Sequence, residues 1–499
     1  MPGSTLAELI QEASKVEQPS WNSPFTPALG GVDPLGLRQI NFDLMDLVIP
    51  GLNNVVRYIR PFTVISWAWR RAAICAERAG KLKVTTEELQ DFVDRIEVLY
   101  VWSQLLRDGA ASLPGREFLG FLVKTNSYTF GGASWKAIRN ARKYSTALSA
   151  PINYGPVVKS FGWIEQAKIK GAYKSTVMVS SALDAFDKAL NPYLTHPAFS
   201  SLGTVSVSRE EAECWGTAWD LTRPSVEECK AIAYSFGGDL APKRRKDGSN
   251  LIHAAAAFLN GNCQVNKMRR IMCGESGGFL PPATLSDVAE HWNAVQARQL
   301  FRLSLEALLH WVILQLGNRA KTTSMLAAQF VIEAGDEVDT QSWLVDSFES
   351  GSSPVDRIDQ LQKALEYDQI AVHLSLCIRA GLASSLSSVA KGVAEGRQER
   401  LPLERARREM TEFLQMAPVE FLEHVLGSWV FGQHVYWAVG RGLGDARSRG
   451  KTLLRLKVVP EENGWTLAPG AGASVRNPPR PTPDRLESAL RLMIEAKML

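Results

Sequence analysis

The chain has 499 residues, a length that exceeds one compact hydrophobic core and predicts two to four domains, and its net charge is +4. Its six cysteines stand far apart without a C-x-x-C pair, which disfavours a disulfide framework or a structural zinc site and indicates a reducing compartment. The first residues lack the order of a secretion signal, and the apolar runs are too short to span a bilayer. We therefore expect a cytoplasmic protein that does not contact membranes.

Residues 33–72 contain an unusual number of turn residues, arginines and tryptophans. The run Asp33-Pro34-Leu35-Gly36 is typical of a turn, and the next residues predict a short helix that stops at Pro50-Gly51. A second helix is expected to restart with Asn53 or Asn54 as its cap. The apolar density predicts a buried core position for four residues of this stretch: Ile59, Phe62, Ile65 and Trp67.

Helical periodicity dominates the rest of the chain, and β-rich runs are few and short. Helices are predicted at 86–107, 182–190, 225–236, 286–316, 355–380 and 403–438. The expected fold class is therefore mainly α and multi-domain, with small β-hairpins. Loop-rich stretches suggest a tail over 1–32, an N-terminal domain over 33–200, a central domain over 201–354 and a C-terminal domain over 355–499.

One segment has the order of a winged-helix end, and a second segment, over 453–467, is either another winged unit or a simply packed α+β unit. Residues 153–190 predict the order helix, strand, basic turn, strand, helix, with AKIKGAYK as the wing. In the preceding SWKAIRNARKY, the spacing of Lys136, Arg139 and Lys143 places these cations on one helical face. A basic helix beside a basic wing is suited to duplex phosphates. A second strand pair is predicted over 453–467, before a last helix that begins after Pro483. Both segments could equally be protein-contact modules.

The positive charge is concentrated in three windows. Residues 136–174 carry a net +7, residues 243–270 a net +6 and residues 439–457 a net +5, so the remainder carries −14. Such segregation is expected of a surface that binds a polyanion. The alternative is a set of solvated faces that never converge. The predicted nucleic-acid contacts are Lys136, Arg139, Arg142, Lys143, Lys159, Lys168, Lys170, Lys174, Lys243, Arg244, Arg245 and Lys246.

Catalytic and metal-binding motifs are weak. Glu306 with His310 and Asp287 with His291 each have the spacing of two ligands on one helical face, but the pairs are too far apart to share a metal. A third possible cluster consists of Glu420, Glu423 and His424, and Asp220, Glu228 and Lys230 spell a loose nuclease-like motif in a helical context. Motifs for nucleotide binding or nucleophilic catalysis are missing. No catalytic residue, metal or cofactor is predicted, and the tryptophans are expected to be core residues.

The run DPLGL…IPGLNNVVRYIRPFTVISWAW, followed by YGPVVKSFGWIE…AYKSTV, resembles a group of uncharacterised bacterial proteins. Their genes often lie among mobile or anti-phage defence genes, so the resemblance implies a context more than an activity. We expect a DNA-binding accessory subunit of a bacterial anti-phage defence or genome-maintenance complex, with duplex DNA and other subunits as partners. The alternatives are a protein-interaction scaffold that binds no nucleic acid, and a nuclease effector whose site the sequence conceals.

Overall fold

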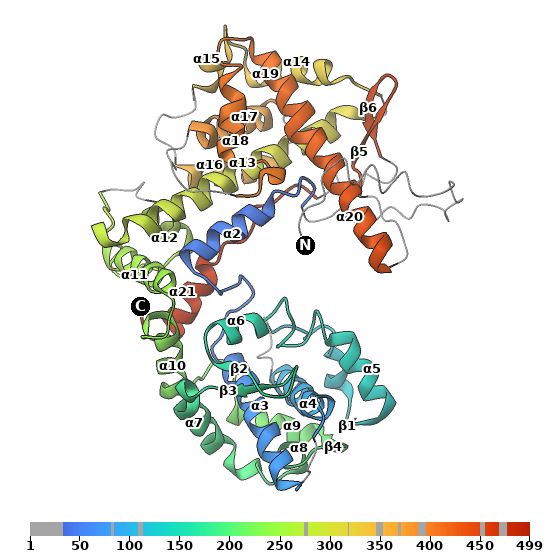
Figure 1. Ribbon diagram of the computed structural model, residues 1–499, viewed down its shortest axis with the longest axis vertical. Helices are drawn as coiled ribbons and strands as arrows, with labels where there is room; N and C mark the ends of the chain where they lie inside the picture. The colour runs from blue at the N-terminus through green and yellow to red at the C-terminus, as the bar shows by residue number, and fades with distance from the viewer. Residues whose placement is uncertain are drawn as a thin grey trace. The chain divides into compact units, whose positions relative to one another are not determined.

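The computed structural model describes residues 33–80, 84–107, 113–273, 278–317, 319–345, 353–367, 371–387, 396–449, 455–468 and 477–499. These residues are mainly α-helical, with three antiparallel two-stranded sheets, as the sequence predicts (Figure 1). Within them, no helix combines the length and the apolar character that crossing a bilayer requires.

The chain divides into two compact units, each built from separate segments. Unit 1 consists of Met1–Met45, Cys273–Gly278 and Ala289–Thr482, and unit 2 of Asp46–Met272, Phe279–Val288 and Pro483–Leu499. The predicted domain boundaries at residues 200 and 354 fall inside unit 2 and unit 1, respectively. Whether the shorter regions that those boundaries define fold independently stays a prediction.

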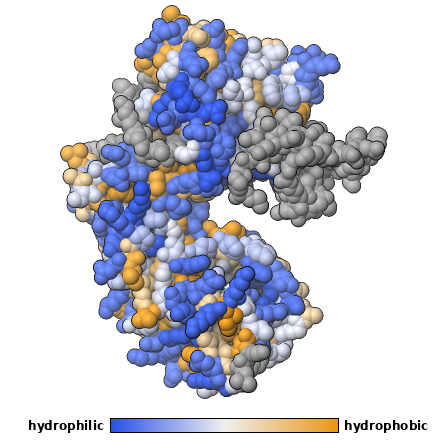
Figure 2. Space-filling model, viewed as in Figure 1, coloured by the Kyte–Doolittle hydropathy of each residue, from blue (hydrophilic) through white to orange (hydrophobic). Residues whose placement is uncertain are grey.

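Unit 2 is organised around two long helices that lie side by side, α3 (Arg60–Arg78) and α4 (Thr86–Leu105) (Figure 1). Its other helices are α5 (Gly132–Arg142), α6 (Gly155–Ser160), α7 (Ser180–Leu190), α8 (Pro197–Ser200), α9 (Arg209–Ala218), α10 (Val226–Gly237), α11 (Lys243–Phe258), α12 (Val265–Met272) and α21 (Leu486–Glu495). The face of unit 2 seen in Figure 2 is largely hydrophilic with smaller hydrophobic patches, because most of its large apolar side chains are buried.

The predicted core of the opening stretch is confirmed. Ile59, Phe62, Ile65 and Trp67 are all fully buried, and the Trp67 indole packs edge-on against Phe186 and Phe199. Their burial explains why this arginine-containing segment is also so rich in apolar residues.

The predicted start of the second helix in the opening stretch is wrong. Helix α3 begins at Arg60, and the side chain of Asn53 instead accepts hydrogen bonds from the backbone N–H groups of Val55 and Val56. Asn53 therefore forms a local turn of the kind that asparagine favours over a helix cap. Pro61 at the first turn of α3 fits a helix start, since the missing N–H of proline is not needed there.

Unit 1 is built around the long helix α13 (Ser286–Leu316) from Ala289 onward, and the side chains of this helix are buried all round between Ala297 and Ile313. The other elements are α2 (Arg38–Val48), α14 (Thr323–Ala334), α15 (Thr340–Leu344), α16 (Pro354–Tyr367), α17 (Ala371–Ser387), α18 (Leu403–Thr411), α19 (Pro418–His424), a π-helix over Val425–Gly432, and α20 (Gln433–Arg449). The helix predicted over 403–438 is therefore interrupted, with Pro418 starting a new helix because proline is tolerated in a first turn and not in a helix interior.

Each sheet is a single antiparallel strand pair. The two predicted hairpins are present: β2 (Ile164–Gln166) pairs with β3 (Tyr173–Ser175), and β5 (Val458–Glu461) pairs with β6 (Gly464–Leu467). The third pair joins β1 (Ser127–Phe130) to β4 (Val205–Ser208), which sequence reasoning missed because the partners are far apart in the chain. The predicted order of helix, strand, turn, strand and helix over 153–190 is observed, and its identity as a winged helix stays a prediction.

Candidate nucleic-acid interface

Helix α5 faces an acidic stripe on α4. The Lys136 ammonium lies 3.7 Å from a Glu87 carboxylate oxygen, and the Arg139 guanidinium contacts Asp91 at 3.0 Å and Asp94 at 2.8 Å. The predicted cationic face of α5 is therefore largely neutralised within the fold. Arg139, whose side chain is 13% exposed, positions α5 against α4 and is not free for phosphate.

Arg142 extends this contact into the interior. Its side chain is 1% exposed, and none of its guanidinium nitrogens has a hydrogen-bond partner among the described residues. Burial lowers the pKa of Arg142, and the nearby Glu97 and Asp94 carboxylates act against that shift. Burial likewise raises the pKa of Glu97 to about 7. The prediction of Arg142 as a surface contact is corrected: it belongs to the packing of α5 on α4.

The second basic window is also partly interior. Arg245 is 2% exposed, and its guanidinium donates to the backbone carbonyls of Pro50, Ser160 and Ser235 while lying 4.1 Å from the centre of the Phe161 ring. Burial lowers its pKa to about 10. Arg245 is thus a structural residue whose guanidinium satisfies three backbone carbonyls by hydrogen bonds. Its predicted role in phosphate contact is likewise corrected.

The three neighbours of Arg245 on α11 are more accessible. Lys243 is exposed and pairs with Asp247 one turn along the helix. Arg244 is exposed and donates to the Leu47 carbonyl over 3.5 Å, whereas Lys246 is half-buried. Of the four predicted contacts on α11, only Lys246 has a side chain that makes neither a hydrogen bond nor an ion pair within the described ranges.

Four lysines of the first window have no carboxylate partner in the described part of the chain. They are exposed and come from three places: Lys143 follows α5, Lys159 ends α6, and Lys168 and Lys170 lie in the turn of the β2–β3 hairpin. Lys174, by contrast, pairs across the hairpin with Glu165 at 2.9 Å. The charge available to a polyanion in this window therefore falls on those four lysines.

The hairpin turn is fixed to the start of α4. The Thr86 hydroxyl donates to the carbonyl of Lys170 over 3.0 Å, and the Gln90 amide donates to the carbonyl of Gly171 over 3.0 Å. Gly171 adopts a φ of +83°, a left-handed conformation that suits glycine in such a turn. These contacts hold the segment that carries Lys168 and Lys170 in one place on α4.

A cavity of about 710 Å³ lies between α4, α5, α6 and the hairpin. Its lining includes Trp69, Val93 and Ile164 as apolar residues and Lys143 and Lys159 as cations. Further lining residues are Thr86, Glu87, Gln90, Asp94, Arg139, Asn140, Ala147, Ser149, Pro151, Gly155, Pro156, Gly171 and Tyr173. The volume falls in the range of small-molecule sites, roughly 300–1,000 Å³.

The charged groups that line the cavity differ in whether they have a partner of opposite charge. Asp94 is engaged by Arg139, and burial raises its pKa against the effect of that hydrogen bond. Glu87 faces Lys136. The Lys159 ammonium lies 5.9 Å from the centre of the Tyr173 ring, and the Tyr173 ring meets the Trp69 indole edge-on at 5.4 Å. Lys159 thus lies beside an aromatic pair of the lining, whereas both acids of the lining are paired with cations.

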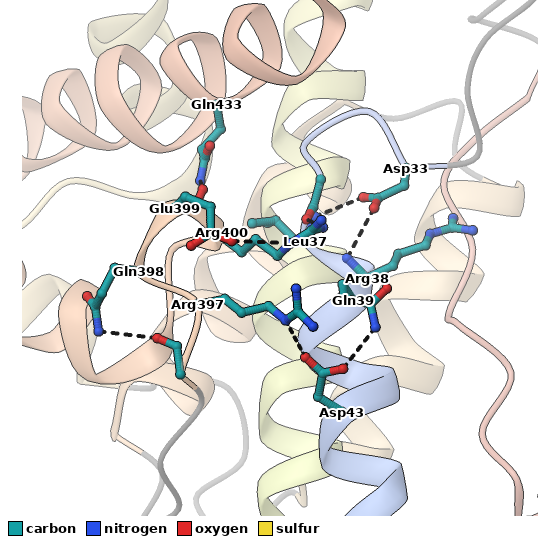
Figure 3. Close-up of polar contacts among 12 residues, drawn as sticks. Asp33, Leu37, Arg38, Gln39, Asp43, Arg397, Gln398, Glu399, Arg400 and Gln433 are labelled. Carbon is teal, nitrogen blue, oxygen red and sulfur yellow. Dashed lines mark hydrogen bonds and ion pairs between the residues drawn. The ribbon is translucent and has the colours of Figure 1, made fainter. Parts of the chain in front are cut away.

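The third basic window belongs to unit 1, where the described cations are again tied to the fold. Arg441 pairs with Asp33 at 3.4 Å, and Asp33 accepts hydrogen bonds from the backbone N–H groups of Leu37 and Arg38 at the start of α2 (Figure 3). Burial lowers the pKa of Lys457. The side chains of Arg447, Arg449 and Lys451 fall outside the described residues.

The DPLG turn of the opening stretch has a packing role. Gly36 adopts a φ of +70°, and a Cβ atom there would lie 2.3 Å from the Trp437 ring. The Pro34 carbonyl accepts a hydrogen bond from His434, and the Gly36 carbonyl accepts one from Arg400. In Figure 3, Arg397 and Gln39 converge on Asp43, which links the 397–400 segment to α2. Sequence reasoning identified this turn without its partners on α20.

The weak chemical motifs form no metal site among the described residues, and several of their side chains are engaged in the fold. No group of three or more histidine, cysteine, aspartate or glutamate residues in the described ranges could hold a metal ion. Glu306 pairs with Arg302, and the pKa of His310 is lowered by burial to about 4. Glu228 sits in the first turn of α10, where its carboxylate accepts the backbone N–H of the N-cap residue Ser225 and pairs with Arg60, so it is a structural carboxylate.

The acidic partners on α4 are the residues that sequence reasoning missed. Glu87, Asp91 and Asp94 recur at steps of four and three residues, which places them on one face of the predicted helix. This spacing complements that of Lys136 and Arg139 on α5, and it is the sequence signal from which the pairing of α4 with α5 could have been predicted.

Compared with known proteins, the chain matches no family model, no curated protein and no solved structure.

Proposed function

We propose that unit 2 binds nucleic acid, with duplex DNA as the ligand and Lys143, Lys159, Lys168 and Lys170 as the phosphate contacts. The observation that carries the proposal is that these four lysines stay exposed and without carboxylate partners in the described residues, while most neighbouring cations are paired or buried. Lysine ammonium groups near phosphates release condensed counterions, which gives affinity without reading sequence.

The anchoring of the hairpin supports the same proposal. Because Thr86 and Gln90 hold the turn on α4, Lys168 and Lys170 lose little conformational freedom on binding beyond that of their own side chains. Lys159 and Lys143 line the cavity whose wall includes the same turn through Gly171. A ligand that spans the hairpin and the cavity entrance would therefore meet cations from three elements.

We propose further that this binding serves an accessory subunit of a bacterial anti-phage defence or genome-maintenance complex. The support is the resemblance of the DPLGL and YGPVVKSFGWIE segments to bacterial proteins encoded near such genes. Other subunits of the same gene cluster would be the protein partners. The rival is a scaffold whose lysines meet acidic proteins.

The test is salt-titrated binding of the full chain to duplex DNA, comparing the wild type with a variant in which Lys143, Lys159, Lys168 and Lys170 are changed to Glu. The variant should bind about a hundredfold more weakly at low salt, with a flatter dependence of affinity on salt. Arg139 is left unchanged because its pairing with Asp91 and Asp94 supports the fold. An unchanged melting temperature shows that the variant folds, and equal affinity of the two folded proteins would contradict the proposal.

A further inference from the structure

We propose that the cavity between α4, α5, α6 and the hairpin holds one unpaired nucleotide of the bound nucleic acid. This inference rests on the proposed function and names the part of the ligand that the cavity takes. A duplex alone offers phosphates to the exposed lysines, but it has no free base to fill a cavity of about 710 Å³. An overhanging nucleotide, in contrast, supplies a flat apolar face and a phosphate together.

The lining matches both parts of a nucleotide. Trp69, Val93 and Ile164 are nearly buried and provide apolar surface, with exposed fractions of 6%, 2% and 5%. The half-buried Tyr173 adds an aromatic ring, and bases stack on such rings without regard to sequence. A base has a π-face that this surface accepts, whereas a sugar or a free inorganic anion does not.

The phosphate would be met by Lys143 and Lys159, which line the cavity from separate elements and have no acidic partner in the described part of unit 2. The two acids that also line the cavity are engaged, Glu87 by Lys136 and Asp94 by Arg139. The cavity therefore presents unpaired positive charge without unpaired negative charge. This balance favours an anionic ligand over a cationic one.

A hydrogen-bonding group for the base edge is also present. Asn140 lines the cavity, is exposed, and makes no hydrogen bond through its side chain with the described residues. An asparagine amide both donates and accepts, as the edge of a base requires. Lys143, one turn further along the chain, places a cation close to this amide.

The experiment compares binding of the full chain to a blunt duplex and to the same duplex with a short single-stranded overhang that carries 2-aminopurine. The cavity is blocked by Asn140→Trp, and the matched control is Asn250→Trp, which also replaces an exposed helical asparagine of unit 2. The wild type and the control should bind the overhang about tenfold more tightly than the blunt duplex, with a change in 2-aminopurine fluorescence. In Asn140→Trp that preference should fall to less than about twofold while blunt-duplex affinity is kept.

The failures of the two proposals differ. Equal binding of blunt and overhanging DNA by the wild type, or an unchanged preference in Asn140→Trp, overturns the nucleotide site and leaves duplex binding standing. Failure to bind either DNA overturns both proposals. If Asn140→Trp does not fold, Tyr173→Ala replaces it, because this change removes the ring and leaves all lysines in place. The same loss of overhang preference is expected, and its absence contradicts the inference.

Discussion

Helix α5 and the β2–β3 hairpin both belong to the most basic window of the sequence, yet they use their charge differently. Lys136 and Arg139 on α5 meet the acidic stripe of α4, whereas Lys168 and Lys170 on the hairpin turn have no carboxylate partner in the described residues. Net charge along a sequence window does not separate these two uses. The partner element does, and the acidic partners on α4 lie 45 to 49 residues earlier in the chain.

Among the predicted contacts, the buried cations are both arginines, whereas lysines occur both with and without a carboxylate partner. Arg139 is paired, Arg142 and Arg245 are buried, and the four exposed cations of the 136–174 window that have no carboxylate partner in the described residues are all lysines. A guanidinium is more weakly hydrated than an ammonium and offers several donors in a fixed plane, so it is better suited to interior positions. The predictions below test whether this division is correct, from the largest expected effect to the smallest.

The first prediction contrasts two neighbours on α11. Arg245→Ala should lower the free energy of unfolding by about 3–5 kcal/mol, because the carbonyls of Pro50, Ser160 and Ser235 lose a buried donor. Lys246→Ala should change it by less than about 0.5 kcal/mol, since the Lys246 side chain makes neither a hydrogen bond nor an ion pair in the described structure. Denaturant unfolding of both variants measures the difference, and similar losses would contradict the division between arginine and lysine.

The second prediction tests the interface of α4 and α5 through pH. The pKa of Glu97 is raised by burial from 4.5 to about 7 in the folded chain, so the folded state holds a proton that the unfolded state releases. The contribution of Glu97 to the free energy of unfolding is therefore fully present below about pH 4.5 and is lost as pH rises through about 7. The expected change is about 3 kcal/mol. Glu97→Gln should remove this component.

The measurement is the free energy of unfolding of the wild type and Glu97→Gln at several values between pH 4.5 and 8. The difference between the two proteins should shift in favour of the variant as pH rises, whatever its value at low pH. A difference that is independent of pH would show that Glu97 is already ionised throughout this range, and that its carboxylate is not desolvated by the contact with α5.

The third prediction asks whether the DPLG turn of unit 1 is structural. Gly36 and Gly396 both have a φ of +70°, but only Gly36 lies against another group, the Trp437 ring. Gly396→Ala should cost about 1–2 kcal/mol from backbone conformation. Gly36→Ala should cost about 1–3 kcal/mol more, because its Cβ overlaps the ring. Equal losses in calorimetric melting would remove the packing explanation for this turn.

Much of the fold could be predicted from the sequence because it rests on local signals. Helix α13 agrees with its predicted range, and the β2–β3 and β5–β6 hairpins lie where turn residues separate short β-rich runs. The α3 start was missed because Asn53 satisfies nearby backbone groups in a turn instead of capping a helix. The β1–β4 pair was missed because its hydrogen bonds join residues that share no local pattern.

The candidate site was only partly accessible from sequence. The window of 136–174 was identified by charge, which is additive along the chain and needs no structure. Which cations remain accessible to a ligand depends on packing, as Arg142 shows by its burial against α4 and Lys170 by its place on an exposed turn. The cavity could not be predicted, because Trp69, Asn140 and Tyr173 meet only in three dimensions.

The most direct test of the account compares two triple variants of equal charge in duplex binding across a range of salt concentrations. One changes the unpaired Lys143, Lys168 and Lys170 to Gln, and the other changes the paired Lys136, Lys174 and Lys243 to Gln. The first should reduce the slope of log affinity against log salt by about 0.9 for each DNA phosphate that is no longer neutralised, and the second should leave it nearly unchanged. Equal reductions of the slope in both variants would show that DNA affinity depends only on the net charge of the protein. That result would contradict the assignment of phosphate binding to the unpaired lysines.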